Sequence, residues 1–166
     1  MTMKKKLLEH QFKYRRDPSI NADSEMAIII LKPGFTLKQK DEVSSFISHS
    51  GLRLLHETDF QFDAKSTLAL YNDIFRFNDQ DIVFGYQWKD QKLMYMLSGL
   101  SRVYIIQGRS AQSLAESFKY KLRNTYGKLS VPDKRLSSAE FGELAIKNII
   151  HVVDTNETEI ALRLFF

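Results

Sequence analysis

The chain has 166 residues, and its four histidines are the side chains best suited to act as a nucleophile or general base near neutral pH. For three of them, His10, His49 and His56, a surface or structural role is the simpler interpretation. His151 differs, because it directly follows the apolar pair 149–150 in a short β-branched run. A neutral imidazole at a strand end can act as a nucleophile, although the pattern alone is more typical of a histidine packed in a core.

Several other site chemistries are excluded by composition and motif. The chain has no cysteine, which excludes disulfides, thiol nucleophiles and cysteine-held zinc. This composition fits a reducing compartment, so we expect a cytoplasmic location. No two histidines have the spacing of a catalytic zinc site. The G-x-x-x-x-G-K-[ST] loop and the G-x-G-x-x-G fingerprint of nucleotide-binding proteins are also absent.

The charge balance suits an anionic ligand but does not identify it. Twenty-four Lys and Arg residues against 20 Asp and Glu residues give a formal net charge of +4. Much of this excess lies in residues 1–16, which we interpret as part of a solvated extension, with nucleic-acid or membrane contact as the less favoured alternative. No apolar run reaches the roughly 18 residues of a membrane helix, and no secretory signal follows the basic start.

The elements that must position His151 are strands and helices in alternation. Short β-branched or apolar runs predict strands at 26–32, 52–62, 102–106 and 149–153. Apolar residues at helical spacing predict helices at 38–49, 64–75, 88–97 and 110–123 and after Asp154. Gly51 suits a left-handed cap after the first helix, and Asp63 is a candidate N-cap for the second.

This order of elements predicts an α+β fold. With four strands, the economical arrangement is the ferredoxin-like split βαβ fold, a four-stranded antiparallel sheet with helices packed on it. We expect one domain over residues 26–166, preceded by a basic extension or linker over residues 1–25.

Short motifs along this domain occur in the same order in one enzyme family. They are Lys32-Pro33, Gly51-Leu52-Arg53-Leu54, Tyr71, Tyr95-Met96-Leu97-Ser98-Gly99, Leu122-Arg123-Asn124-Thr125 and Asn148-Ile149-Ile150-His151 followed by Asp154-Thr155. Together they resemble the nucleoside diphosphate kinases over roughly residues 26–166. The resemblance implies the same ferredoxin-like fold that the order of elements predicts.

The resemblance also implies a reaction. It is ping-pong transfer of a γ-phosphoryl group from a nucleoside triphosphate such as ATP through a phosphohistidine, with Mg²⁺ bound through the phosphates and not by protein ligands. His151 would be the nucleophile. The residues expected to bind the nucleotide are Lys32, Tyr71, Trp88, Lys119, Arg123, Thr125 and Asn148.

Each of these residues has an implied role. By position, Lys32 would neutralise the transferred phosphate and Tyr71 would orient it, Asn148 would meet the ribose hydroxyl, and Thr125 would hold a phosphate oxygen. Trp88 would stack on the base, with core packing as the alternative. Lys119 stands where the family has a phosphate-binding arginine, and Arg123, four residues on, can share its helix face.

Other positions differ from the family pattern. Gly34 stands where the family has an acid, and Val152-Val153 replace the small residues and the serine after the histidine. Ser138 stands at the position of the loop arginine. The glutamate that orients the histidine would be Leu162 without a gap, or Glu159 after a three-residue shift. An alternative function is therefore a catalytically impaired nucleotide- or partner-binding module on the same fold.

The expected partners are nucleoside di- and triphosphates and further copies of the chain. Apolar side chains fall on both faces of the predicted strand 52–62, and a strand of this kind at a sheet edge pairs with another copy unless it is covered. We therefore expect a dimer or a higher oligomer. The alternative is that residues 1–25, or an insertion at 76–86, cover the strand. Contact with a membrane or with nucleic acid is not expected.

Overall fold

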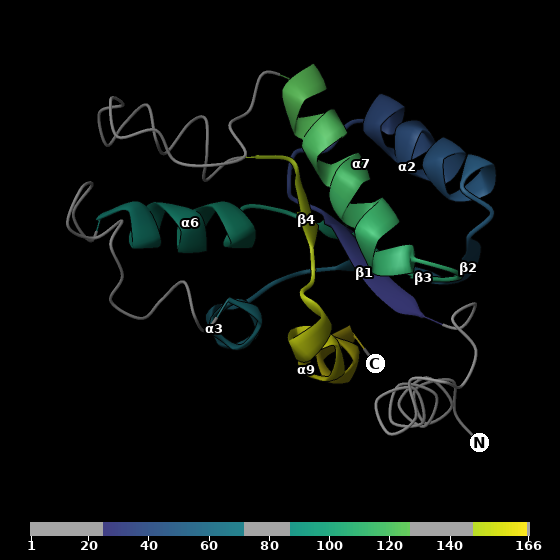
Figure 1. Ribbon diagram of the computed structural model, residues 1–166. Coiled ribbons are helices and arrows are strands. Elements are labelled where there is room, and N and C mark those ends of the chain that lie inside the picture. The colour runs from purple at the N-terminus through teal and green to yellow at the C-terminus, as the bar shows by residue number, and fades with distance from the viewer. Residues whose placement is uncertain (1–24, 72–86, 127–147, 166) are drawn as a thin grey trace.

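A computed structural model describes residues 25–71, 87–126 and 148–165 of the chain (Figure 1). The elements, in chain order, are β1 (Met26–Leu31), α2 (Leu37–His49), β2 (Arg53–Phe60), α3 (Ala64–Leu70), α6 (Gln87–Leu97), β3 (Ser101–Gln107), α7 (Ala111–Thr125), β4 (Ile150–Val152), a 3₁₀ turn (Thr155–Glu157) and α9 (Thr158–Phe165). The predicted insertion at 76–86, and all of the predicted extension except Glu25, lie outside the described residues.

The four strands form one sheet in the order β2-β3-β1-β4, and each neighbouring pair is antiparallel. The predicted ferredoxin-like α+β fold is therefore confirmed. The two central strands, β1 and β3, come from distant parts of the sequence. Their register places Met26 opposite Gln107 and Leu31 opposite Arg102. The sheet edges are β2 and the three-residue strand β4, which carries His151.

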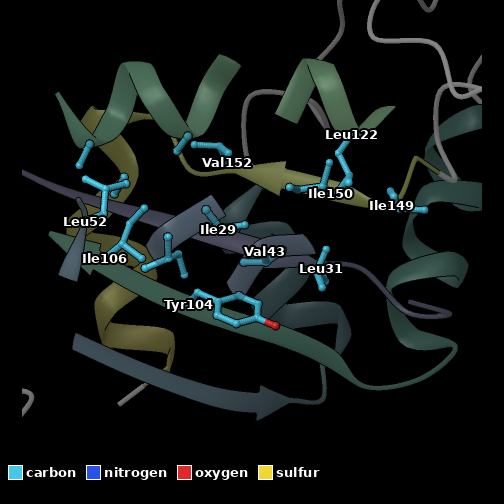
Figure 2. Packing of buried hydrophobic residues seen from close by; sticks show 14 residues of the cluster. Ile29, Leu31, Val43, Leu52, Tyr104, Ile106, Leu122, Ile149, Ile150 and Val152 are labelled. Carbon is cyan, nitrogen blue, oxygen red and sulfur yellow. The ribbon is translucent and has the colours of Figure 1, made fainter. Parts of the chain in front are cut away.

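Helices cover both faces of the sheet (Figure 1). All six residues of β1 are buried, and because side chains alternate along a strand they divide between two cores. Ala27, Ile29 and Leu31 pack with residues of α2 and α7 (Figure 2). Ile28 and Ile30 pack on the opposite face with residues of α3, α6 and α9. This double burial explains why β1 reads as a continuous apolar run in the sequence.

The register of β4 on β1 decides where His151 lies. His151 is paired with Ile30, and directly opposed residues of an antiparallel pair share a face of the sheet. Its neighbours Ile150 and Val152 belong to the core under α2 and α7 (Figure 2). His151 therefore points to the face that carries α3, α6 and α9.

Local signals at the helix ends agree with the predictions from sequence. The Asp63 carboxylate accepts a hydrogen bond from the Ser66 backbone N–H at 2.7 Å, which confirms the N-cap of α3. The start of α2 has a reciprocal capping box between Thr36 and Gln39. Along the described residues, no helix combines the length and the hydrophobicity that crossing a membrane requires.

Gly51 provides a test of the turn that leads from α2 into β2. Its φ is +67°, and a Cβ added there would meet no atom within 4 Å. We expect Gly51→Ala to destabilise the fold by about 1–2 kcal/mol through backbone strain alone, because left-handed φ is unfavourable for alanine. Gly51→Asn is the matched variant and should be less destabilising. Urea unfolding measures both, and equal midpoints for Gly51→Ala and the parent would contradict this account.

Candidate functional site

His151 lies beside Tyr71, at the C-terminal end of α3. The two ring centroids are 4.8 Å apart, with an angle of 54° between the ring planes. The Nε2 atom of His151 and the hydroxyl of Tyr71 are both buried and have no hydrogen-bond partner among the described residues. Buried polar atoms without partners are uncommon, and they cluster at sites that bind or react.

Lys32 enters the site because β1 ends directly before it. Its backbone N–H donates to the carbonyl of Ile149 at 2.8 Å, which extends the pairing of β1 with the start of β4. Its side chain is only 1% exposed, and Nζ donates to Oδ1 of Asn148 at 2.8 Å. The sheet therefore brings together Lys32, Asn148 and His151, three of the residues expected from the sequence.

Arg123 reaches the same place from the last turn of α7. Ile149 and Val153 both form backbone hydrogen bonds with the β1 side of the ladder, to Lys32 and Ile28. Because successive residues of a strand alternate in direction, the carbonyl of Ile150 points away from β1. Arg123 Nη2 donates to this free edge carbonyl at 2.8 Å and to Asn148 Oδ1 at 3.0 Å. The Asn148 oxygen is therefore shared between two buried cations, Lys32 and Arg123.

Lys92, on α6, is a member of the site that the sequence analysis missed. Its side chain is 8% exposed, and Nζ lies 4.2 Å from the centroid of the Tyr71 ring. A signal was present in the sequence, because Lys89, Lys92 and Met96 follow one another at helical spacing and all three are buried. Two lysines on the buried stripe of a helix are unusual, since lysine is rarely buried unless it is paired.

Three of the expected nucleotide-binding residues stand apart from this group or only at its margin. Lys119 forms an ion pair with Glu116 one turn earlier on α7. The Thr125 hydroxyl donates to the Lys121 carbonyl of its own helix, and Thr125 lines a groove of about 770 Å³ between α2 and α7. Trp88 lies on α6, but its side chain is outside the described residues.

The charges of the site act on His151 together. Burial lowers the pKa of His151 well below its usual value, and the positive charges of Lys32, Lys92, Arg123 and Lys119 lower it further. Burial and neighbouring cations also lower the pKa of Lys32 well below its usual value. Burial raises the pKa of the Tyr71 hydroxyl. At neutral pH the site therefore favours a neutral imidazole beside three basic side chains, Lys32, Lys92 and Arg123.

Neither candidate for an orienting glutamate reaches His151. Glu159 accepts a hydrogen bond from Arg163 Nη2 at 2.7 Å on the surface of α9. Leu162 is buried in the core formed by α3, α6 and α9. Among the described residues Nε2 of His151 has no partner, and when this nitrogen carries the ring proton the unsatisfied buried donor is unfavourable by about 1–3 kcal/mol.

The comparisons with known proteins agree with the fold. No family model matches the sequence, and no curated protein matches it. Solved structures do match, and three of them are nucleoside diphosphate kinases. The enzyme from Pyrobaculum aerophilum is 18% identical with a TM-score of 0.55, over 86% of this chain and 96% of that one. The chain has the fold of nucleoside diphosphate kinases.

Two further enzymes of this kind give the same result. The nucleoside diphosphate kinase from Encephalitozoon cuniculi is 20% identical with a TM-score of 0.55, over 83% of this chain and 87% of that one. The enzyme from Aquifex aeolicus is 19% identical with a TM-score of 0.54, over 84% of this chain and 94% of that one. At these identities the likeness concerns the fold, so function must be argued from the site itself.

The depressed pKa of His151 predicts how stability depends on pH. Below the ordinary histidine pKa of 6.5 the unfolded chain takes up a proton at His151, whereas the folded chain does not. Stability should therefore fall as the pH decreases below 6.5, by up to about 1.4 kcal/mol per pH unit from this residue. Urea unfolding at pH 7, 6 and 5 should show a smaller loss in His151→Gln. Equal losses in both proteins would show that His151 is protonated in the folded state.

Proposed function

We propose that the chain is a phosphotransferase of the nucleoside diphosphate kinase type, which moves a γ-phosphoryl group from a nucleoside triphosphate through a phosphohistidine at His151. The observation that carries this proposal is the position of the His151 ring beside Tyr71, among the buried basic side chains of Lys32, Lys92 and Arg123. Burial and these neighbours lower the pKa of His151, which favours the neutral imidazole. A nucleophile must be unprotonated to react, and a transferred phosphoryl group needs cations around it.

The nitrogen that reacts follows from the burial of the ring. Nε2 is enclosed by protein, so Nδ1 is the nitrogen that we assign to the reaction. Its lone pair forms a bond to the γ-phosphorus while the bond from that phosphorus to the β-phosphate oxygen breaks, and the nucleoside diphosphate leaves with the electron pair. A second nucleoside diphosphate then attacks the phosphohistidine through its terminal oxygen and restores the neutral ring.

Mg²⁺ enters this scheme as part of the substrate. The side chains around His151 are cations, an amide and a phenol, and these groups suit phosphate oxygens better than a divalent cation. Among the described residues, no three His, Asp or Glu side chains lie close enough together to hold a metal ion. Mg²⁺ bound through the phosphates stays a prediction, and there it would neutralise charge on the β- and γ-phosphates.

The second candidate function is a module that binds nucleotide without turnover. The unpartnered Nε2 of His151 favours it, because a hydrogen bond at one ring nitrogen normally sets which nitrogen carries the proton. Nucleotide would still bind through Lys32, Arg123 and Lys92. The two functions therefore share a binding site and differ only in whether a phosphoryl group is transferred.

Covalent labelling separates these two functions. Incubation with γ-labelled ATP and Mg²⁺ should give an acid-labile, base-stable label that His151→Ala abolishes. His49→Ala is the matched control, because His49 ends α2 on the surface and should leave the label unchanged. We expect turnover about 10²–10³-fold below that of a typical family member, since the described residues place no orienting partner at Nε2.

The outcomes of this experiment lead to different conclusions. Label that survives in His151→Ala would overturn the assignment of the nucleophile. Thermal stabilisation by ATP without any label would support the binding module. If the protein takes up no label and ATP does not stabilise it, both candidate functions are contradicted.

We also propose that the chain forms a dimer through its β2 edge. Leu54, on this edge strand, is 42% exposed. A symmetric partner would cover it with the same strand. Light scattering at micromolar concentration should give twice the 19.3 kDa mass of the chain. Leu54→Lys should give a monomer, whereas Leu37→Lys, at a 77% exposed position at the start of α2, should not. A monomeric parent would contradict the proposal.

A further inference from the structure

Lys92 approaches His151 from the opposite direction to the other cations. Arg123 and Lys119 come from α7, and Lys32 from the end of β1, whereas Lys92 comes from α6 on the other face of the sheet. Its Nζ lies over the ring of Tyr71, which in turn lies against His151. Lys32 Nζ is 6.0 Å from the centroid of the same ring. Tyr71 therefore stands between two lysines and the histidine.

The groups facing Lys92 are almost all positive or neutral. They are Lys32 directly after β1, His151 on β4, Tyr71 at the end of α3 and Arg123 on α7. Tyr95, on the same helix as Lys92, acts on Tyr71, and Lys119, on α7, acts on Lys32 and His151. Of the acids nearby, Glu116 is paired with Lys119, and Glu157 acts on Tyr71. In the described part of the chain, no carboxylate forms a salt bridge with Lys92, Lys32 or Arg123.

When no ligand is bound, these neighbours disfavour the simultaneous protonation of Lys32, Lys92 and Arg123. Burial, followed by the charge of Arg123, lowers the pKa of Lys92 to about 7. Above pH 7 the amine is therefore mostly neutral in the free protein, and the Tyr71 ring and the surrounding core accommodate it in this form. A polyanion close to Nζ would reverse the balance, because an opposite charge nearby favours the ammonium form.

We propose that Lys92 is a further ligand-binding residue of this site, which takes up a proton from solvent when a triphosphate group binds and then pairs with it as an ammonium ion. This proposal rests on the proposed function only in placing the phosphates beside His151. The chemistry recognised is the triphosphate group, whether it belongs to a nucleotide or is inorganic. Lys92 would make the affinity depend on pH and on the number of negative charges on the ligand.

Calorimetry measures the proton directly. ATP, and separately inorganic tripolyphosphate, are titrated into the full chain at pH 8 in two buffers of different ionisation enthalpy. The difference in observed heat gives the number of protons taken up. We expect the parent to take up protons, and Lys92→Met, which keeps the length of the side chain without its charge, to take up close to one proton fewer. Lys65→Met, at an exposed position on α3, is the matched control and should match the parent.

A second variant separates charge from packing. Lys92→Arg stays charged at every pH tested, so its binding should also take up close to one proton fewer than that of the parent. As the pH rises from 7 to 9, the affinity of the parent should fall by up to about 10-fold per pH unit. The affinity of Lys92→Arg should fall much less. A purely structural cation–π contact with Tyr71 would produce neither difference.

The outcomes distinguish this proposal from the proposed function. Equal proton uptake by the parent and Lys92→Met would overturn the role of Lys92 and leave the phosphotransferase intact. Uptake with tripolyphosphate but not with ATP would support an anion site at Lys92 and contradict the nucleotide function. If neither ligand binds the parent, both proposals are overturned.

Discussion

One amide oxygen, Oδ1 of Asn148, joins the three elements that make the site. It accepts hydrogen bonds from Lys32, at the end of β1, and from Arg123, on the last turn of α7. Asn148 itself stands just before β4, so the strand end, the helix end and the edge strand meet at this atom. Without this oxygen the two buried cations would repel each other with no shared acceptor between them, and an unpaired buried charge is strongly unfavourable. The position of His151, three residues further along, depends on the same junction.

The basic side chains gathered in the site favour the binding of an anion there. Lys32, Lys92 and Arg123 are buried near one another, so protonation of all three at once is unfavourable in the free protein. Natural sequences usually avoid such conflicts, and they keep them where function requires it. An anion that binds only to the folded chain relieves the repulsion and stabilises the fold in proportion to its concentration. The two hydrophobic cores of the sheet therefore hold together a group of basic side chains whose repulsion a bound polyanion would reduce.

Sequence reasoning predicted the fold well and the site in part, for reasons visible at particular residues. The run 26–32 and the helical spacings are local patterns, and they placed each strand and α-helix of the described chain. The predicted helix 64–75 nevertheless ends at Leu70, where Tyr71 is the C-cap of α3, and the 3₁₀ turn at 155–157 was not predicted. The positions of His151 and Lys32 could be predicted from the sequence, because each residue belongs to or directly follows a short apolar run that forms a strand. The directions of the Lys92 and Thr125 side chains could not be predicted from the sequence. The inward direction of a lysine on α6, and the contact of the Thr125 hydroxyl with its own helix, depend on how the helices pack. Spacing in the sequence does not report that packing.

The same charge pattern has opposite effects on the two halves of a phosphohistidine cycle. A phosphoryl group on Nδ1 would add negative charge beside Lys32, Lys92 and Arg123, and would therefore stabilise the phosphorylated protein. The ring proton is on Nε2 both before and after the transfer, and in neither state do the described residues offer it an acceptor. A carboxylate at Nε2 would remove that penalty and would also raise the pKa of His151, which the cations now lower. In this chain burial, and then the neighbouring cations, lower the pKa of His151, so the side chains that would bind the phosphates also help to keep the imidazole neutral.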